Sequence, residues 1–233
     1  MKARVGRYGV WQLRDYMVGV GGVTLLLGVL AIGMARGTNV SVGAADRVQH
    51  VASHMVADWL LGVVSFLGAV VACNGLVSDD RSRGYYRFLL SKPMNPVRYY
   101  LQAYAVRGAG FLAITALLWA ECALLIGVGS FAGTVGNAAL CYVGFGGVTF
   151  LFSTTWRHAG VVTLACCAAA NIVNGLLSRS IGWQPLWVLL HALLPPVHAI
   201  GMASVSLVIW LAGYGLVALA LAMAAIRGKE WPL

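Results

Sequence analysis

Histidines and aspartates recur at four-residue intervals in the polar stretch 44–58. These residues are Asp46, His50, His54 and Asp58, and a helix here would place them along one slowly drifting face, because four residues slightly exceed one helical turn. A histidine pair at positions i and i+4 can chelate a divalent metal, and carboxylates can complete its shell. A solvated face of a surface helix explains the same pattern, since His-x-x-x-His alone is a weak signal. Both interpretations stay open.

Other patterns that would carry catalysis are incomplete. The pair Asp79-Asp80 resembles the aspartate pairs by which membrane prenyltransferases hold magnesium diphosphate, but the next charged residue is the basic Arg81, and that chemistry needs several carboxylates. The Gly228-Lys229 pair lacks the upstream glycine of a Walker A motif, and the chain has no Gly-x-Ser-x-Gly nucleophile elbow. We therefore expect a chain that is no enzyme and that binds no cofactor itself.

The composition is that of a membrane protein. Of the 233 residues, 60% are hydrophobic and 10% are charged, and the mean hydropathy is +0.82, which excludes an ordinary soluble domain. The net charge of +9 does not point to nucleic acid, because the basic residues flank apolar runs. The five cysteines lie inside apolar segments without CxxC spacing, which argues against a disulfide framework.

A few polar side chains fall inside the apolar runs. Asn74, Asn171 and Asn174 are expected to form hydrogen bonds across helices. An ionised carboxylate facing lipid would cost at least ~2.5 kcal/mol, so Glu121 should face protein or water. It can be protonated and bonded to Asn171 or Asn174, or it can line a translocation pathway that takes cationic or polar cargo. We favour the pathway, because an ionisable residue inside the membrane is by default a functional candidate.

Six apolar runs are long enough to cross a bilayer. A crossing helix needs about 20 residues, and the runs are 16–35, 56–77, 108–129, 138–155, 159–177 and 205–226. We expect an all-α integral membrane protein with one transmembrane domain over 1–233. Residues 1–15 would form an interfacial helix, 130–137 a tight outer turn, and 178–202, which prolines interrupt, short re-entrant helices on the outer side.

The distribution of basic residues predicts the orientation. With six spans, the inner segments hold thirteen basic residues (four, six, one and two) and the outer segments hold three, which recovers all sixteen. Lys/Arg-rich short loops stay in the cytoplasm. The sequence thus predicts that both termini are cytoplasmic.

The longest charged interruption, 78–107, follows the second span. A short helix from Asp79 to Leu90 would end before Pro93, with Arg83 and Arg87 on its polar face and Phe88 on its apolar face. Such a helix could meet a soluble partner, or it could bind lipid headgroups.

An acidic residue, a glycine four positions later, a Leu-Leu pair and a nearby proline follow the second span, as Asp80, Gly84, Leu89-Leu90 and Pro93. This arrangement resembles the permease subunits of type-2 ABC transporters, and the resemblance in layout covers nearly the whole chain. The basic residue that the family often has soon after the proline comes later here, as Arg98, so the end of this loop departs from the family's pattern.

The resemblance implies a role for the whole loop 78–98. It would be the cytosolic coupling loop that docks on a separate ATP-binding subunit, through Asp79, Asp80, Arg83, Gly84, Arg87, Phe88, Leu89, Leu90 and Pro93. ATP and Mg²⁺ would bind that partner, and a second permease subunit, identical or different, would complete the pathway. The expected setting is the inner membrane of a bacterium, and the expected activity is export.

Two other functions stay open on the sequence. The membrane subunit of a haem exporter in cytochrome c maturation has a similar size and span count. A non-transporting scaffold or assembly protein is the alternative from a different class. Co-purification with an ATPase would separate a transporter subunit from a scaffold.

Overall fold

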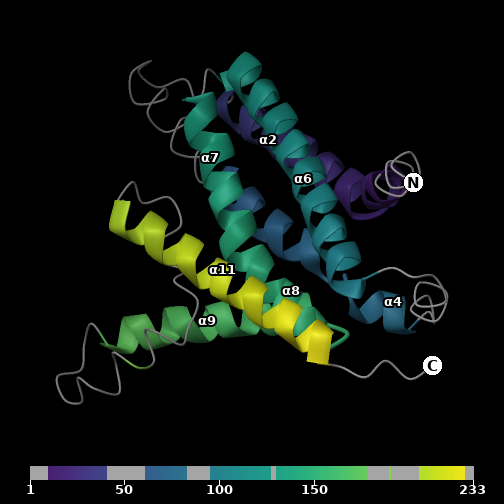
Figure 1. Ribbon diagram of the computed structural model, residues 1–233. Coiled ribbons are helices and arrows are strands. Elements are labelled where there is room, and N and C mark those ends of the chain that lie inside the picture. Colours follow the sequence, from purple (N-terminus) through teal and green to yellow (C-terminus); the bar gives the residue numbers. More distant parts are fainter. Residues whose placement is uncertain are drawn as a thin grey trace. The chain divides into compact units, whose positions relative to one another are not determined.

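The computed structural model describes residues 10–40, 61–82, 95–126, 130–177, 189 and 205–228. All regular secondary structure in these ranges is helical, which confirms the all-α class (Figure 1). Within them, four helices are long and apolar enough to cross a membrane: Leu61–Ser82, Pro96–Leu124, Phe131–Ser153 and Val205–Gly228. The pair Val10–Gly19 and Gly22–Leu30, bent by 44°, would be a fifth span. The chain therefore has the helices of a multi-pass membrane protein.

The elements follow one another along the chain, with π-helical turns marked η. They are η1 (Met17–Gly21), α2 (Gly22–Val40), α4 (Ser78–Ser82), α6 (Pro96–Ile126), α7 (Phe131–Cys141), η2 (Tyr142–Gly146), α8 (Gly147–Ser153), α9 (Ala159–Leu177) and α11 (Val205–Gly228). A further helix covers 61–73 and precedes α4. The stretch Ala159–Val173 of α9, where the fifth span was expected, is a shorter apolar helix than the four above.

Two helices begin earlier than the hydropathy of the sequence suggested. Helix α6 starts at Pro96, and Asn95 caps it, because the Val97 backbone N–H donates to Asn95 Oδ1 at 3.0 Å. Helix α7 starts at Phe131, where the Gly133 N–H donates to Ser130 Oγ at 3.4 Å. The expected turn over 130–137 is therefore wrong. Its glycines and threonines break helices in water, but backbone groups close to lipid are satisfied best inside a helix.

Other predicted elements lie outside the described residues. They are the first part of the interfacial helix, 1–9, and the outer re-entrant region 178–202 apart from Leu189. These elements stay predictions.

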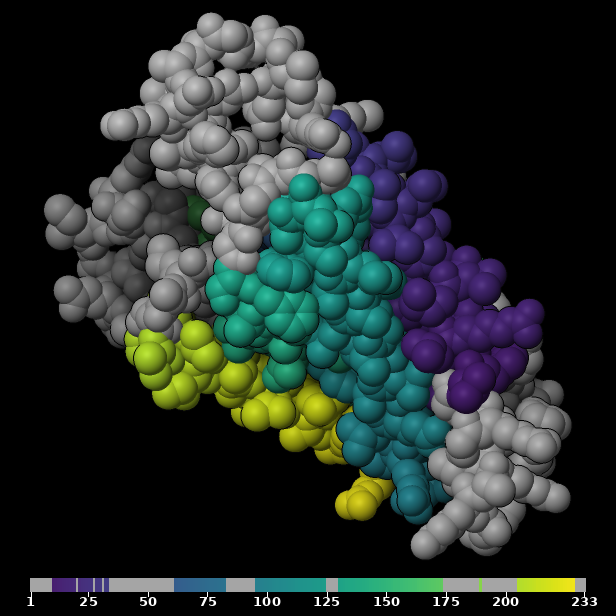
Figure 2. Space-filling view, turned by 90° about the horizontal axis from the view of Figure 1, so that it is seen from above, coloured from purple at the N-terminus to yellow at the C-terminus, as the bar shows by residue number. Residues whose placement is uncertain are grey.

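The described helices fall into two compact units. Unit 1 comprises Met1–Ala72 and Ala105–Ala139, and its N-terminal helices lie along α6 (Figure 2). Glycines permit the close approach: a Cβ on Gly28 would lie 2.6 Å from Leu118, and one on Gly68 would lie 2.7 Å from Phe111. Small residues thus pack helices together within the chain, as in other membrane proteins.

Unit 2 comprises Cys73–Tyr104 and Leu140–Leu233. Here α11 packs against η2 and α8 (Figure 1). The backbones nearly touch, because a Cβ on Gly147 would lie 2.6 Å from the Gly215 carbonyl oxygen, and one on Gly144 would meet Leu211. A side chain at Gly147 would force the two helices apart, because its neighbour is backbone, whereas one at Gly144 would require the Leu211 side chain to move.

Candidate functional site

The helix over 61–73 ends in a turn that its sequence determines. Gly75 has φ +69°, a left-handed conformation that glycine adopts without a Cβ penalty, and it is the one described residue with positive φ. The Asp79 N–H donates to the Gly75 carbonyl at 2.9 Å, and the Asp79 carboxylate lies where a Cβ on Gly75 would be. Helix α4 therefore begins directly after the turn.

Three hydrogen bonds attach this turn and α4 to the connection between α8 and α9. The Gly160 N–H donates to Asn74 Oδ1 at 2.9 Å, the Ser78 hydroxyl donates to the Arg157 carbonyl at 3.5 Å, and Arg81 Nη1 donates to the Thr154 carbonyl at 3.3 Å. The expectation that Asn74 bonds across helices is confirmed. We call the two segments Asn74–Ser82 and Thr154–Gly160 together the α4 junction.

The α8–α9 connection is shaped by its own threonines. The Thr154 hydroxyl donates to the Leu151 carbonyl at 2.8 Å, and the Thr155 hydroxyl donates to the Phe152 carbonyl at 3.2 Å. The same carbonyls also accept backbone N–H groups, Leu151 from Thr154 and Phe152 from Thr155 and Trp156, so the end of α8 is closed by side-chain and backbone donors together. The first turn of α9 is in turn capped by Asn74, so the connection is fixed at both ends.

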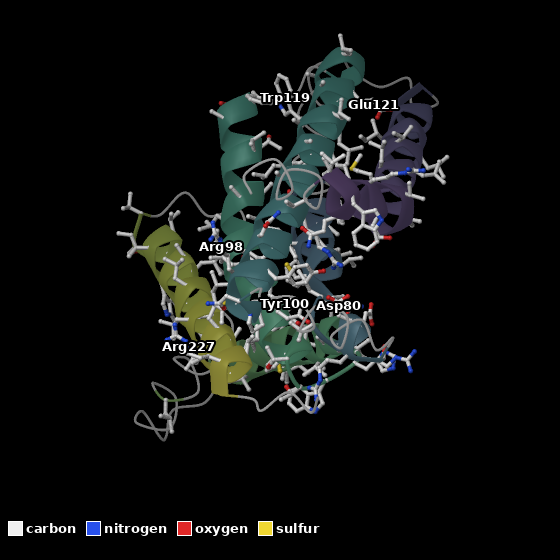
Figure 3. All side chains as sticks on the ribbon, turned by 45° about the vertical axis from the view of Figure 1, so that its right-hand side comes forward. Asp80, Arg98, Tyr100, Trp119, Glu121 and Arg227 are labelled. Atoms are coloured by element: carbon white, nitrogen blue, oxygen red, sulfur yellow. The ribbon has the colours of Figure 1, made fainter. Side chains whose placement is uncertain are left out.

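The acidic and basic residues of the α4 junction differ in how exposed they are. Asp79 and Asp80 are half-buried, whereas Arg81, Arg157 and His158 are exposed. Tyr100, only 2% exposed, lies within electrostatic reach of Asp80 and Arg81, and Figure 3 shows Tyr100 and Asp80 close together. The basic residues of the junction are therefore more exposed than its acidic residues, although Arg81 also donates to the Thr154 carbonyl within the junction.

No protein-family model and no curated protein matches this chain. A functional assignment thus rests on the residues and contacts of the chain itself. The α4 junction is the part of the predicted coupling loop that lies within the described residues.

The structure describes two residues of the predicted coupling set. Asp79 and Asp80 belong to α4, and both are half-buried, so their predicted docking role also stays a prediction. The other members lie outside the described residues: Arg83, Gly84, Arg87, Phe88, Leu89, Leu90 and Pro93. Their docking role stays a prediction.

Glu121 lies near the last described turn of α6. It is half-buried on α6, five residues before the end of the helix at Ile126, and it makes no hydrogen bond or ion pair with any described residue. Nearby, the rings of Trp119 and Phe131 pack edge to face with centroids 4.9 Å apart. Aromatic side chains gather where a membrane meets water. Figure 3 labels Trp119 and Glu121 on α6, and the predicted position of Glu121 inside the membrane stays a prediction.

Some of the remaining predicted site residues are described by the structure, and the others lie outside the described residues. Asn171 is exposed on α9 in unit 2, whereas Glu121 belongs to unit 1, and the predicted hydrogen bond of Glu121 to Asn171 or Asn174 stays a prediction. The stripe Asp46, His50, His54 and Asp58 lies outside the described residues. Within the described ranges, no group of three or more His, Cys, Asp or Glu side chains could hold a metal.

Two interactions were not anticipated from the sequence. Arg107, first counted with the charged loop, lies inside α6, and its Nη1 donates to the Ala72 carbonyl at 3.1 Å in the last turn of helix 61–73. Tyr104 and Tyr142 exchange hydroxyl-to-carbonyl hydrogen bonds at 3.0 and 2.5 Å, which join α6 to η2. A π-helical turn leaves backbone carbonyls available to such donors. The pairing could not be predicted because the two tyrosines are 38 positions apart in the sequence.

Proposed function

We propose that the chain is the membrane subunit of an ATP-driven transporter of the type-2 ABC class. The cytosolic segment that begins with α4 docks on a separate ATP-binding subunit. ATP and Mg²⁺ bind that subunit, because the sequence carries no Walker A motif. The observation that carries the proposal is the set of three hydrogen bonds by which α4 and the turn before it are attached to the α8–α9 connection.

These bonds supply a physical route for coupling. A displacement of α4 pulls on the Thr154 and Arg157 carbonyls through Arg81 and Ser78. The turn before α4 also holds the first turn of α9 through Asn74. A partner that moves the charged segment would therefore move the ends of three apolar helices together, and we propose that the junction is the two-state element that energetic coupling requires.

The orientation of the junction follows from its charges. Its exposed ionisable groups are the basic Arg81 and Arg157 together with His158, and basic loops remain in the cytoplasm. With this side in the cytoplasm, we propose that both termini are cytoplasmic, that the chain crosses the membrane six times, and that a second permease subunit completes the pathway. Export is the direction we propose, in the inner membrane of a bacterium.

Purification of the complex tests the proposal. The tagged chain is extracted in mild detergent, and the expected result is a stoichiometric soluble partner with a Walker A motif and ATPase activity. Phe88→Asp combined with Leu89→Asp should release that partner, whereas Phe88→Leu with Leu89→Ile should retain it. A chain that brings down no ATP-binding protein, although it is folded and monodisperse, would favour the scaffold function instead.

A further inference from the structure

Three exposed residues, Trp156, Arg157 and His158, form the end of the α8–α9 connection, and we call them the tip. Trp156 is 51% exposed, and its ring packs on Phe152 of α8 with centroids 5.4 Å apart. In the part of the chain that the structure describes, the side chains of Arg157 and His158 form no hydrogen bond or ion pair. Both side chains are therefore available to a ligand from outside.

The tip lies between the ends of two apolar helices. The span Phe131–Ser153 ends shortly before it, and the apolar helix Ala159–Val173 begins directly after it. The span has 23 residues, which is roughly 35 Å of helix, whereas the hydrocarbon core of a bilayer is about 30 Å thick. Residues 154–158 are too short a link to extend far from the bilayer. With this span in a membrane, the tip lies at the level of the lipid headgroups.

Hydrogen bonds on both sides of the tip hold its backbone. The Ser78 hydroxyl donates to the Arg157 carbonyl at 3.5 Å, and the Gly160 N–H donates to Asn74 Oδ1 at 2.9 Å. The Arg157 and His158 side chains thus start from a backbone that is attached to another helix. A fixed backbone favours a defined binding site over a diffuse basic surface.

The chemistry of the tip suits a phosphate group. The planar guanidinium of Arg157 can donate two parallel N–H bonds to phosphate oxygens. The imidazole of His158 and the indole of Trp156 each carry a further N–H donor. The acidic residues of the α4 junction, Asp79 and Asp80, are half-buried, so the exposed residues of the junction include no carboxylate that would repel an anion.

We propose that the tip binds the headgroup of an anionic phospholipid such as phosphatidylglycerol, with the lipid phosphate on Arg157 and His158. Lipid phosphates are the most abundant anions at the level of the tip, and tryptophan is enriched at that level in membrane proteins. A basic site prefers a headgroup with net negative charge to a zwitterionic one. The inference rests on the multi-pass membrane character of the chain and not on the transporter assignment, so either can fail alone.

Binding at the tip also acts on the α4 junction. Arg157 accepts the bond from Ser78, and Gly160, which donates to Asn74, follows three residues later. A headgroup that restrains the tip therefore restrains one partner of each bond. A ligand that binds only the closed form of the junction increases the population of that form by mass action. The junction is then more stable in membranes that are rich in anionic lipid.

The test measures the affinity of the full-length chain for single phospholipids by native mass spectrometry from a neutral detergent. Arg157→Gln should weaken binding of phosphatidylglycerol roughly fivefold, which is the contribution of one basic residue near an anionic lipid surface. Arg157→Lys should retain most of the affinity, and His158→Gln should weaken it. The matched control is Arg227→Gln, which removes an exposed basic residue at the end of α11 and should leave the affinity unchanged.

Hydrogen exchange at the Gly160 amide gives a second measurement, in lipid nanodiscs. Phosphatidylglycerol should slow this exchange in wild type, relative to nanodiscs of phosphatidylcholine alone, and should not slow it in Arg157→Gln. The comparison uses variants whose melting temperature in phosphatidylcholine equals that of wild type, so that a general loss of stability is excluded.

Three results would overturn the inference. Equal losses of affinity for Arg157→Gln and Arg227→Gln would show that net charge alone attracts the lipid. Displacement of phosphatidylglycerol by inorganic phosphate would assign the tip to a free anion. Unchanged lipid affinity in Arg157→Gln, together with loss of a soluble protein that co-purifies with wild type, would make the tip a protein contact.

Discussion

Asn74 Oδ1 accepts a hydrogen bond from the backbone N–H of Gly160 at 2.9 Å. The bond joins residues 86 positions apart and caps the first turn of α9 from the end of another helix. Helix termini leave backbone N–H groups without partners, and a membrane offers few alternatives to a side-chain acceptor. This contact therefore ties the end of the second apolar helix to the start of α9.

Replacing Asn74 should destabilise the protein in a specific way. Asn74→Ala removes the cap and should cost about 1 kcal/mol, whereas Asn74→Asp keeps an acceptor and should retain most of the stability. Thermal unfolding in detergent and hydrogen exchange at the first amides of α9 would measure this. Asn171→Ala, at an exposed position of α9, is the control. Equal losses for Asn74→Ala and Asn171→Ala would show that the cap does not matter.

Any side chain at Gly215 should destabilise the protein. A Cβ there would meet the backbone of Val143 and Gly144, with the Val143 carbonyl carbon at 2.6 Å. Backbone cannot yield as a flexible side chain does, so Gly215→Ala should cost about 1–3 kcal/mol through overpacking. Gly213→Ala, two positions earlier in α11, meets nothing within 4 Å and should be neutral or stabilising. Similar melting temperatures for both variants would contradict this packing.

The sequence predicted the fold class and part of the junction, for identifiable reasons. Membrane helices could be predicted because a run of about 20 apolar residues is enough to identify one. Asn74 was predicted to bond across helices because it is a polar residue inside such a run. The start of α6 was missed because its first turns are polar, although the Asn95-Pro96 pair is a helix-start signal. The partners of α4 could not be predicted, since Thr154 and Arg157 contribute backbone carbonyls, which every residue has.

If Glu121 lines the translocation pathway, its negative charge should increase the rate of cation export. Glu121→Gln keeps the shape of the side chain but removes the charge, and we expect export of an organic cation such as ethidium to fall roughly tenfold, equivalent to ~1.4 kcal/mol. Glu121→Asp should retain most of the rate, and export of an anionic dye should not fall in either variant. Identical cation export by wild type and both variants would leave Glu121 with a structural role only.

Single cysteines test the orientation of the junction. In a cysteine-free background, Ser130→Cys at the start of α7 should react with a membrane-impermeant maleimide added to intact cells. Ser82→Cys at the end of α4 should react only after the cells are opened. Both serines are exposed, so access to the reagent decides the result. Labelling of Ser82→Cys alone in intact cells would invert the proposed topology.

Cross-linking from the end of α4 tests most directly whether this segment docks on an ATP-binding subunit. Ser82→Cys carries a short photoactivatable linker in the detergent-purified complex, and Ser130→Cys carries the same linker as control. The account predicts a cross-link from position 82 to the ATP-binding subunit, and none from position 130. Cross-linking from both positions to equal extent, or from position 130 alone, would contradict it.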